Sequence, residues 1–271
     1  MNFLIDYTQP SSIEENAIAI LFFKDQVLLD NGSGVAAPTL LKIKELDKNW
    51  PSSSAYYYLG RLGDLPVYAI ELKEIEVVSL KAATFQPLRM MLETVKEAWF
   101  SLLCRAKQLL QWTQTSYFCS ACGSKTIHST TETAKICVPC NRIIYPSASP
   151  AVIVVVSRGN EILLARSPHF RPGMYSALAG FIEPCESAEQ TIHREIKEEV
   201  SICVKNLKYF GTQYWPFPNS FMIAYHAEYE SGEIQIEPNE IEDARWFTRN
   251  NLPNLPYRSS IARKLIDDFL S

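Results

Sequence analysis

The sequence contains no apolar run long enough to cross a membrane. Its longest apolar runs are Ala17–Phe23 and Ala151–Val156, far short of the ~20 residues that a membrane-spanning helix needs. The first ten residues lack a basic start, and Asp6 interrupts their apolar stretch, so they do not resemble a secretion signal. The last residues do not form a peroxisomal signal. We therefore expect a cytoplasmic protein with no membrane partner.

An excess of positive charge is also missing. The 26 lysines and arginines are outnumbered by 30 aspartates and glutamates, which gives a formal net charge of −4. Such a balance does not make nucleic acid the default partner. No internal repeat or low-complexity tract is visible in the sequence, and 47% hydrophobic with 21% charged residues excludes a chain that is disordered throughout.

The seven cysteines are an odd number in a chain without a recognisable secretion signal, which argues against a disulfide framework. Four of them form two Cys-x2-Cys pairs, Cys119 with Cys122 and Cys137 with Cys140. Two such pairs can place four thiolates tetrahedrally around one Zn²⁺, and four cysteine ligands close the coordination shell. We therefore expect a structural zinc site at these four residues.

Other interpretations of the cysteines are weaker. Four unrelated thiols would not need this spacing, and a redox-active pair would not need a second pair. Zinc ribbons occur in nucleic-acid-binding proteins, but the loop between the pairs contains only Lys125 and Lys135 as cations. We therefore expect the ribbon to hold two parts of the chain together.

Three regions follow one another along the 271 residues. Residues 1–115 are predicted to form a mixed α+β domain for scaffolding or dimerisation, with strands at Ala17–Phe23, Tyr56–Leu59 and Val67–Leu72 and a long helix over Pro87–Trp112. Residues 116–146 hold the zinc ribbon, and the linker Pro146–Pro150 leads into a domain over 147–271. In that domain we expect strands at 151–157, 161–165, 202–213 and 220–230 and helices at 188–200 and 258–270, which is an α/β layered pattern.

Residues 180–202 combine a glycine-bearing loop with a glutamate-rich helix. Ser187 followed by Gln190 is a capping-box pattern, so the helix is predicted to begin there. At about 100° per residue, Glu195, Glu198 and Glu199 fall on one arc, beside an apolar stripe. Such carboxylates repel one another unless a cation lies between them, and hard divalent cations such as Mg²⁺ prefer oxygen ligands. The alternative is an acidic helix face that is simply exposed to solvent, which would contain the same glutamates.

The full spacing of this stretch is Gly180-x5-Glu186-x7-Arg194-Glu195-Ile196-x-Glu198-Glu199-x-Ser201-Ile202, and it resembles the Nudix box. The resemblance implies an α/β/α sandwich around a mixed sheet, with a loop–helix–loop that binds Mg²⁺ or Mn²⁺. It also implies hydrolysis of a nucleoside diphosphate linked to another moiety. Two residues depart from the family: Ser201 and Cys185 replace the usual glycines, which affects the geometry of the loop but removes no carboxylate.

A second motif follows the box. Residues 212–222 place Trp215 and Phe217 between prolines, and a rigid aromatic platform suits stacking against a flat base. A proline-rich turn that packs its aromatics into the core is the alternative. The stretch resembles the SQPWPFPxS signature of the NADH pyrophosphatase branch of the Nudix family, with Thr212 and Tyr214 as departures. That branch also carries a four-cysteine zinc ribbon ahead of its Nudix domain.

The resemblance implies an NAD(H) pyrophosphatase that yields AMP and nicotinamide mononucleotide. Glu195, Glu198, Glu199 and Glu240 would hold the catalytic metals, and Glu186 would be a further metal ligand or a supporting acid. Phe181 and Trp215 would sandwich the nicotinamide, with Trp215 donated by the second subunit of a homodimer. The remaining pocket residues would be Gln213, Ser220, Met222, Tyr145 and Ala262, of which Met222, Ala262 and Tyr145 also fit ordinary core positions.

Two further functions stay open at this point. The same site removes NAD caps from RNA 5′ ends in members of this family, and the net charge of −4 argues only weakly against that substrate. A zinc-ribbon protein that binds nucleic acid and has an inert Nudix domain is the third hypothesis, and the intact set of glutamates argues against it.

Overall fold

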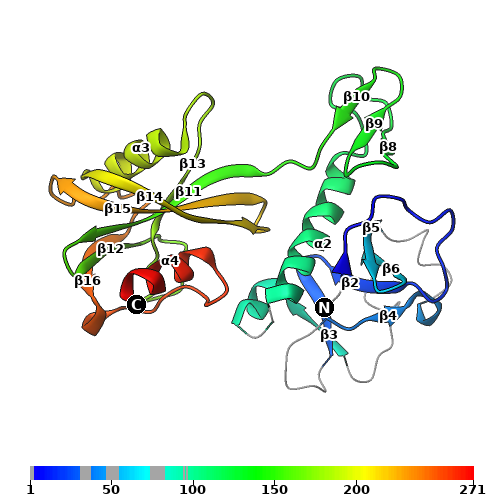
Figure 1. Ribbon diagram of the computed structural model, residues 1–271, viewed down its shortest axis with the longest axis horizontal. Helices are drawn as coiled ribbons and strands as arrows, with labels where there is room; N and C mark the ends of the chain where they lie inside the picture. The colour runs from blue at the N-terminus through cyan, green and yellow to red at the C-terminus, as the bar shows by residue number, and fades with distance from the viewer. Residues whose placement is uncertain (1–2, 31–37, 47–54, 74–82, 94, 96) are drawn as a thin grey trace. The chain divides into compact units, whose positions relative to one another are not determined.

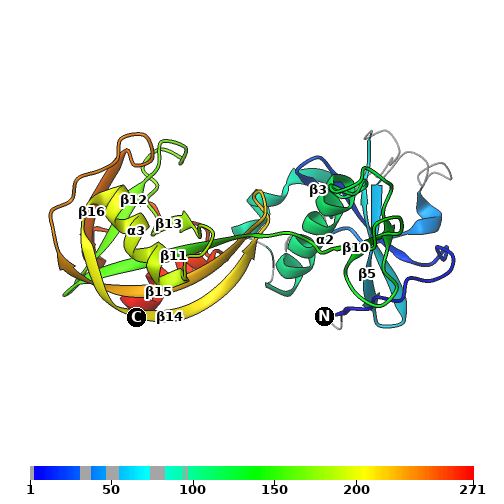
Figure 2. The ribbon, with the colours of Figure 1, turned by 90° about the horizontal axis from the view of Figure 1, so that it is seen from above.

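The computed structural model describes residues 3–30, 38–46, 55–73, 83–93, 95 and 97–271. The chain divides into two compact units, Met1–Ser147 and Ala148–Ser271, which are shown in Figures 1 and 2. The division falls inside the predicted linker. Among the described residues, no helix has both the length and the apolar character needed to span a membrane.

The first unit is built on a sheet with strand order β1-β5-β6-β2-β3-β7, to which β4 adds by pairing with β2. The β2–β6 pair is parallel, so the sheet is mixed. Its core contains Ile20, Leu21, Tyr68 and Ile70, all fully buried. The strands are β1 Phe3–Leu4, β2 Ile18–Phe23, β3 Gln26–Asp30, β4 Leu41–Lys42, β5 Ala55–Leu62, β6 Leu65–Glu71 and β7 Ala83–Pro87.

The long helix predicted over Pro87–Trp112 is wrong in its first part. The structure has a 3-10 helix at Leu88–Glu93, followed by α2 at Glu97–Thr115. Leu88 and Met91 are both buried, and their spacing of three residues is the spacing that a 3-10 helix places on one face. Apolar residues at this spacing therefore also fit a continuous α-helix, which explains the error.

The zinc ribbon follows α2 as a small three-stranded sheet of β8 Ile127–His128, β9 Lys135–Cys137 and β10 Arg142–Ile144. Lys135 ties it to the helix: its side chain is 2% exposed, and its Nζ donates a 2.7 Å hydrogen bond to the carbonyl oxygen of Thr113. The ammonium also lies 5.6 Å from the ring centroid of Trp112. These contacts pack the ribbon against the end of α2, and the expectation that the ribbon holds two parts of the chain together stays a prediction.

The second unit is the predicted α/β/α sandwich, and Figure 1 shows α3 and α4 on opposite sides of its sheet. The strand order is β14-β15-β11-β12-β16, with β13 paired to β11, and the β11–β15 pair is parallel. The strands are β11 Ser149–Arg158, β12 Glu161–Arg166, β13 Leu178–Phe181, β14 Cys203–Trp215, β15 Ser220–Ser231 and β16 Asp243–Thr248, and the helices are α3 Ala188–Val200, α4 Ile261–Leu270 and a 3-10 turn at Arg249–Asn251.

Alternate residues of β11 pack against the two helices, because side chains along a strand point to opposite faces. Val152, Val154 and Val156 share a buried cluster with Ile192, Ile196 and Val200 of α3. Ile153 and Val155 share another with Ile261, Leu265 and Ile266 of α4. The continuous apolar run of β11 is therefore the signature of a strand that is buried on both faces.

The two units repeat one topology, although no repeat is visible in the sequence. The order β5-β6-β2-β3-β7, with β4 on β2, corresponds strand by strand to β14-β15-β11-β12-β16, with β13 on β11. The parallel pair also falls at the same place in both sheets. Between β4 and β5 the described residues contain a 3-10 turn at Ile43–Glu45, whereas α3 lies between β13 and β14.

Candidate active site and zinc site

The helix α3 begins and ends as the sequence predicts. The Oγ atom of Ser187 accepts a hydrogen bond from the backbone of Gln190 (3.2 Å), and Gln190 Oε1 accepts one from the backbone of Ser187 (2.8 Å). This capping box satisfies two N–H groups that the first turn would leave unpaired. At the other end, the Ser201 N–H donates to the carbonyl of Lys197 (3.1 Å). Both ends of the glutamate-bearing helix are therefore fixed locally.

The two departures from the family pattern keep the backbone conformation that glycine would adopt. Cys185 has a φ of 72° and Ser201 a φ of 61°, both in the left-handed region that glycine occupies without strain. For a residue with a side chain this conformation costs ~1 kcal/mol. The two residues therefore add local strain on either side of α3.

Gly180 allows β13 and α3 to approach closely. A Cβ atom at this position would lie 1.8 Å from Cδ of Glu195 and 2.2 Å from its Oε1, which no real packing tolerates. The first glycine of the box is thus required by the position of a predicted metal ligand. Any side chain here would displace the carboxylate of Glu195.

Arg194 connects the loop of the box to its helix. Its Nε and Nη2 donate to the two carboxylate oxygens of Glu186 (2.7 and 2.9 Å), and Nη2 also donates to the carbonyl of Phe181 (3.0 Å). Its Nη1 donates to Glu195 Oε1 (2.9 Å) and Glu198 Oε2 (3.0 Å). A planar guanidinium has five donors in a fixed fork, so one side chain orients three of the carboxylates.

Glu186 is held as a charged anchor of the loop. Hydrogen bonds from Arg194 hold the pKa of its carboxyl down at about 2, and the backbone of Glu183 and the hydroxyl of Thr191 act in the same direction. The Thr191 hydroxyl donates to Glu186 Oε2 over 2.9 Å. Both carboxylate oxygens are thereby engaged. These contacts favour the supporting role for Glu186 over direct metal ligation.

Glu199 is the most unusual acid of the site. Its side chain is 6% exposed, and its Oε2 is buried without a hydrogen-bond partner among the described residues. Burial, followed by the negative charges of Glu195, Glu240 and Glu198, raises its pKa to about 8. Burial is also the main cause of the raised pKa of Glu195, to which the charges of Glu198 and Glu240 contribute. The sequence placed all four of these acids in one site, and their charges act on one another in the structure.

These observations fit a divalent cation. An unpaired buried carboxylate oxygen among like charges is costly, and a hard cation with oxygen ligands would remove that cost. The glutamate oxygens do not form a preassembled cage, because the four cysteines are the one described group of three or more ligands within 4.8 Å of one another. Arg194 instead draws Glu195 and Glu198 toward itself. The fit therefore rests on charge and on the unpaired oxygen of Glu199.

Glu199 should make stability depend on pH when no divalent cation is added. Its pKa rises from 4.5 to about 8 on folding. Its favourable contribution to the free energy of unfolding is therefore complete below pH 4.5 and is lost as the pH rises through 8. Glu199→Gln cannot ionise and should melt higher than the parent at pH 8.5, by several degrees, since ~1 kcal/mol shifts Tm by ~2–4 °C. The gap should shrink at pH 5. Thermal melts at both pH values measure this, and parallel pH profiles for the two proteins would contradict the assignment.

The predicted nicotinamide-binding residues lie on the other face of the sheet from α3. Phe181 pairs with Ala151, Ala151 with Met222, and Met222 with Gln213, so these side chains form one row across four strands on the face that α4 covers. Ser220 and Trp215, which pair with each other, lie two residues along from Met222 and Gln213 and face the same way. Phe181 is 54% exposed, so its ring is open to a ligand.

Other residues of that pocket have structural partners in this chain. The Gln213 side chain donates to the carbonyl of Ser259 (2.8 Å) and accepts from the backbone N–H of Ile261 (2.7 Å), so it caps α4, a role that the sequence does not reveal. Met222 and Ala262 pack in the core beneath α4. Tyr145 belongs to the first unit, where its phenol is hydrogen-bonded to Glu132. Its part in the pocket stays a prediction.

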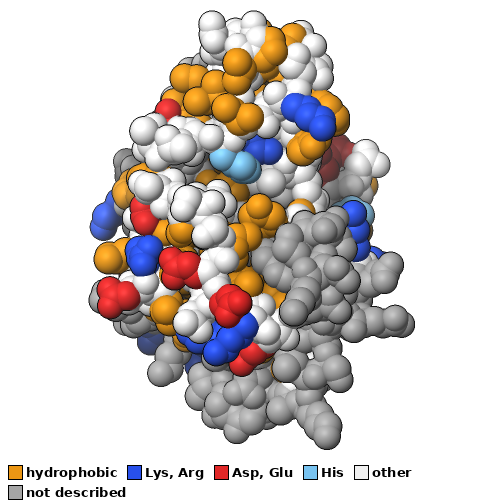
Figure 3. Space-filling model, turned by 90° about the vertical axis from the view of Figure 1, so that its right-hand side faces the viewer, with side chains coloured by type: hydrophobic (Ala, Val, Ile, Leu, Met, Phe, Trp, Pro, Cys, Tyr) orange, Lys and Arg blue, Asp and Glu red, His pale blue; other side chains and the backbone are white. Residues whose placement is uncertain are grey.

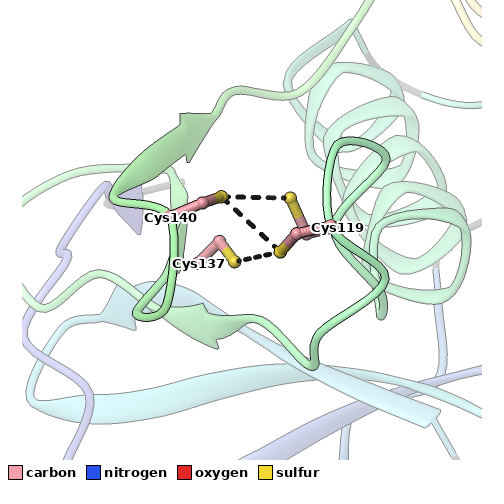
Figure 4. Close-up of side chains that lie close together, drawn as sticks. Cys119, Cys137 and Cys140 are labelled. Atoms are coloured by element: carbon pink, nitrogen blue, oxygen red, sulfur yellow. Dashed lines mark hydrogen bonds between the residues drawn. The ribbon is translucent and has the colours of Figure 1, made fainter.

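The four cysteines converge as expected for a zinc ribbon (Figure 4). The Sγ atoms of Cys122 and Cys137 are 3.3 Å apart, and Cys140 Sγ lies 3.6 Å from both Cys119 and Cys122. All four sulfur atoms lie within 4.8 Å of one another. A tetrahedron with Zn–S bonds of ~2.3 Å has edges of ~3.8 Å, so these separations suit one zinc ion. Gly123, with a φ of 74°, turns the backbone at the first pair.

Purified protein should contain about one zinc per chain, because the four-cysteine set closes a single tetrahedral site. Cys137→Ser should lower both the zinc content and the melting temperature and leave kcat of the folded fraction near that of the parent. Cys203→Ser, outside the ribbon, is the matched control. Metal analysis of freshly purified, unchelated protein checks the content, and a protein without zinc would refute the site.

Comparisons with known family models match three consecutive parts of the chain. Three family models match: the NUDIX domain over residues 148–269, the NADH pyrophosphatase zinc ribbon domain over 114–145, and the NADH pyrophosphatase-like rudimentary NUDIX domain over 16–112. The last match agrees with the topology shared by the two sheets, which the sequence interpretation missed because the first domain lacks the box.

Relatives match along most of the chain. A protein of Pseudomonas syringae pv. tomato named NAD-capped RNA hydrolase NudC is 42% identical over 257 residues, which cover 95% of this chain and 90% of that protein. A protein of the same name from Pseudomonas syringae pv. syringae is 50% identical over 213 residues, which cover 79% and 76%. A crystal structure of a NUDIX hydrolase from Nitrosomonas europaea is 21% identical and covers 56% of this chain and 89% of that one, with a TM-score of 0.48.

Proposed function

Because the chain belongs to the Nudix hydrolase family, with the zinc ribbon of its NADH pyrophosphatase branch, we propose that it hydrolyses the diphosphate of NAD(H). Water attacks one phosphorus, the bridging P–O bond breaks, and the products are AMP and nicotinamide mononucleotide. The observation that carries the proposal is Glu199 Oε2, which is buried without a hydrogen-bond partner among the described residues. Glu199 lies on α3 with Glu195 and Glu198, and the charge of Glu240 also acts on it.

The residues of the proposed metal site have different roles. Glu195, Glu198, Glu199 and Glu240 would hold Mg²⁺ or Mn²⁺. A bound cation of this kind neutralises phosphate charge and lowers the pKa of a bound water. Arg194 positions Glu195 and Glu198 through its two Nη1 hydrogen bonds, and Glu186 fixes Arg194 in turn. Gly180 leaves the space that the Glu195 carboxylate occupies.

The nicotinamide end of the substrate would bind on the opposite face of the sheet. Phe181 offers an exposed ring there, and Trp215, 5.3 Å from Phe217 between ring centroids, would supply the second ring from the partner subunit of a homodimer. Ser220, Met222, Gln213 and Ala262 would shape the pocket, the last three through the packing and capping contacts of α4. Phe181 also links the two ends, since its carbonyl accepts a hydrogen bond from Arg194.

The removal of NAD caps from RNA is the second candidate, and it is favoured by the names of the two relatives, both NAD-capped RNA hydrolases. The bond broken is the same, so the two functions differ only in whether the adenosine carries an RNA chain. Comparing kcat/KM on NADH and on a short 5′-NAD RNA, at saturating Mg²⁺ or Mn²⁺, separates them. Absence of metal-dependent turnover on both substrates would refute the hydrolase proposal and favour an inert Nudix domain.

We also propose the domain arrangement expected from the sequence, namely a scaffold or dimerisation domain over 1–115, a zinc ribbon over 116–146 and a catalytic domain over 147–271. The family matches over 16–112, 114–145 and 148–269 support these limits. The catalytic acids all lie in the third part, so the first two would act through stability and assembly.

A further inference from the structure

A cavity of about 630 Å³ opens within the first unit, where β5, the end of α2 and the zinc ribbon meet. Its size lies within the ~300–1,000 Å³ typical of small-molecule sites. Six aromatic residues line it: Tyr7, Tyr56, Tyr57, Tyr58, Tyr117 and Phe118. The proposed hydrolysis makes no use of it, because the catalytic acids belong to the other unit.

Several of these rings are open to solvent. Tyr7, Tyr117 and Phe118 are 45%, 48% and 56% exposed. Figure 3 presents the right-hand side of Figure 1. It shows hydrophobic side chains gathered on the upper part of that side, at the height of the ribbon in Figure 1. Lys125 places its Nζ 5.5 Å from the centroid of the Tyr117 ring. Aromatic rings held open beside a cation form the kind of platform on which flat bases stack.

The cavity also contains a buried donor. Lys135 lines it although its side chain is 2% exposed, and its one hydrogen bond to a described residue runs from Nζ to the carbonyl of Thr113. An ammonium group has three N–H donors, and Thr113 engages one of them. The polar side chains of Thr126 and Gln114 lie in the same wall. A flat ligand with hydrogen-bonding edges fits this combination better than a purely apolar one.

We propose that this cavity binds a single nucleobase. The base stacks on the exposed rings and accepts a hydrogen bond from Lys135, with its sugar toward solvent. The carboxylates of Asp6 and Glu132 also line the cavity, and their charge keeps phosphate groups outside it. The base comes either from a free nucleoside or nucleotide or from a single-stranded RNA, because both present the same ring. The site is independent of the hydrolytic reaction.

Isothermal titration of the full-length protein with adenosine, with AMP and with an uncapped ten-nucleotide oligoadenylate tests this site. Adenosine should bind in Tyr117→Ala at least ~10-fold more weakly than in the parent, as loss of a stacking ring predicts. Tyr209→Ala is the matched control, because Tyr209 is 56% exposed but lies on β14 in the other unit. Tyr7→Ala provides a second cavity variant in case Tyr117, near the zinc ligands, affects the ribbon. Zinc content and melting temperature are measured for every variant.

Adenosine binding that both cavity variants weaken and Tyr209→Ala preserves would support the site. Tighter binding of the oligonucleotide than of adenosine would identify RNA as the source of the base, and equal or tighter binding of AMP would identify the free nucleotide. Absence of adenosine binding would overturn the proposal. Adenosine binding that both cavity variants leave unchanged would also overturn it, because the ligand would then occupy another site, the proposed active site included. Turnover of NADH by the cavity variants tests the hydrolase proposal separately.

Discussion

Glu199→Gln should lower kcat on NADH by ~100-fold or more, because a charged group that acts in the transition state is worth at least that factor. The side chain is buried, and glutamine keeps its shape while removing the negative charge that would bind the cation. The fold should survive, since the substitution also removes the cost of a buried carboxylate whose Oε2 has no hydrogen-bond partner among the described residues. Steady-state rates over a range of Mg²⁺ and Mn²⁺ concentrations, with a thermal melt alongside, measure both effects.

An exposed acid provides the control for this experiment. Glu233 lies in the exposed segment after β15, so Glu233→Gln makes the same chemical change outside the site and should leave the rate unchanged. If Glu199→Gln retained activity within threefold of the parent both at saturating cation and at the cation concentration that half-saturates the parent, Glu199 would have no role as a ligand in the reaction. Activity that high metal concentration restores would instead indicate weakened binding of the cation.

The local part of the site could be predicted from the sequence because it depends on local rules. The start of α3 follows from Ser187 and Gln190, and the arc of acids follows from the helical repeat. Burial was not predictable in this way: Glu199 and Glu198 are neighbours in sequence, yet Glu199 is 6% exposed while the Glu198 side chain is 58% exposed. That difference depends on how α3 packs on the sheet, which only the tertiary structure shows.

Contacts between distant segments were beyond the sequence for the same reason. Gln213 caps a helix 46 and 48 residues further along the chain, and no local pattern marks such a partner. The relation between the two sheets was hidden because a topology can persist through pattern and connectivity while the residues change. The first domain keeps the strand order but has no acidic box. The motif that identified the second domain therefore could not identify the first.

Trp215→Ala should impair substrates that contain nicotinamide far more than ADP-ribose. Stacking on an aromatic ring is worth ~1–3 kcal/mol per base, so kcat/KM for NADH should fall selectively by ~10- to 100-fold. Trp215 faces the same side of the sheet as Gln213 and follows it by two residues in β14, at the end of the strand. Measuring kcat/KM for NADH and for ADP-ribose on the same protein isolates the contribution of the nicotinamide.

Trp246→Ala serves as the structural control, because its indole packs within the same unit, 4.2 Å from the guanidinium of Arg158 and 5.6 Å from the ring of Tyr229. Loss of that packing should lower the melting temperature and affect both substrates alike. If Trp215→Ala behaved like Trp246→Ala, with equal losses on NADH and ADP-ribose and a lowered melt, Trp215 would be a packing residue and the assigned specificity would be wrong.

The same residue tests the homodimer. If Trp215 completes the pocket of its partner, a mixed dimer of a Glu199→Gln subunit and a Trp215→Ala subunit contains one site with both residues intact. Mixing the two inactive or impaired variants should then restore NADH turnover in proportion to the mixed dimers formed. Subunit exchange is followed independently with two affinity tags, so that formation of mixed dimers is known.

If Trp215 serves its own subunit, each subunit of the mixed dimer lacks one of the two residues, and exchange restores nothing. Restored turnover would therefore establish both the dimer and the shared pocket, and a lack of recovery despite demonstrated exchange would refute the shared pocket.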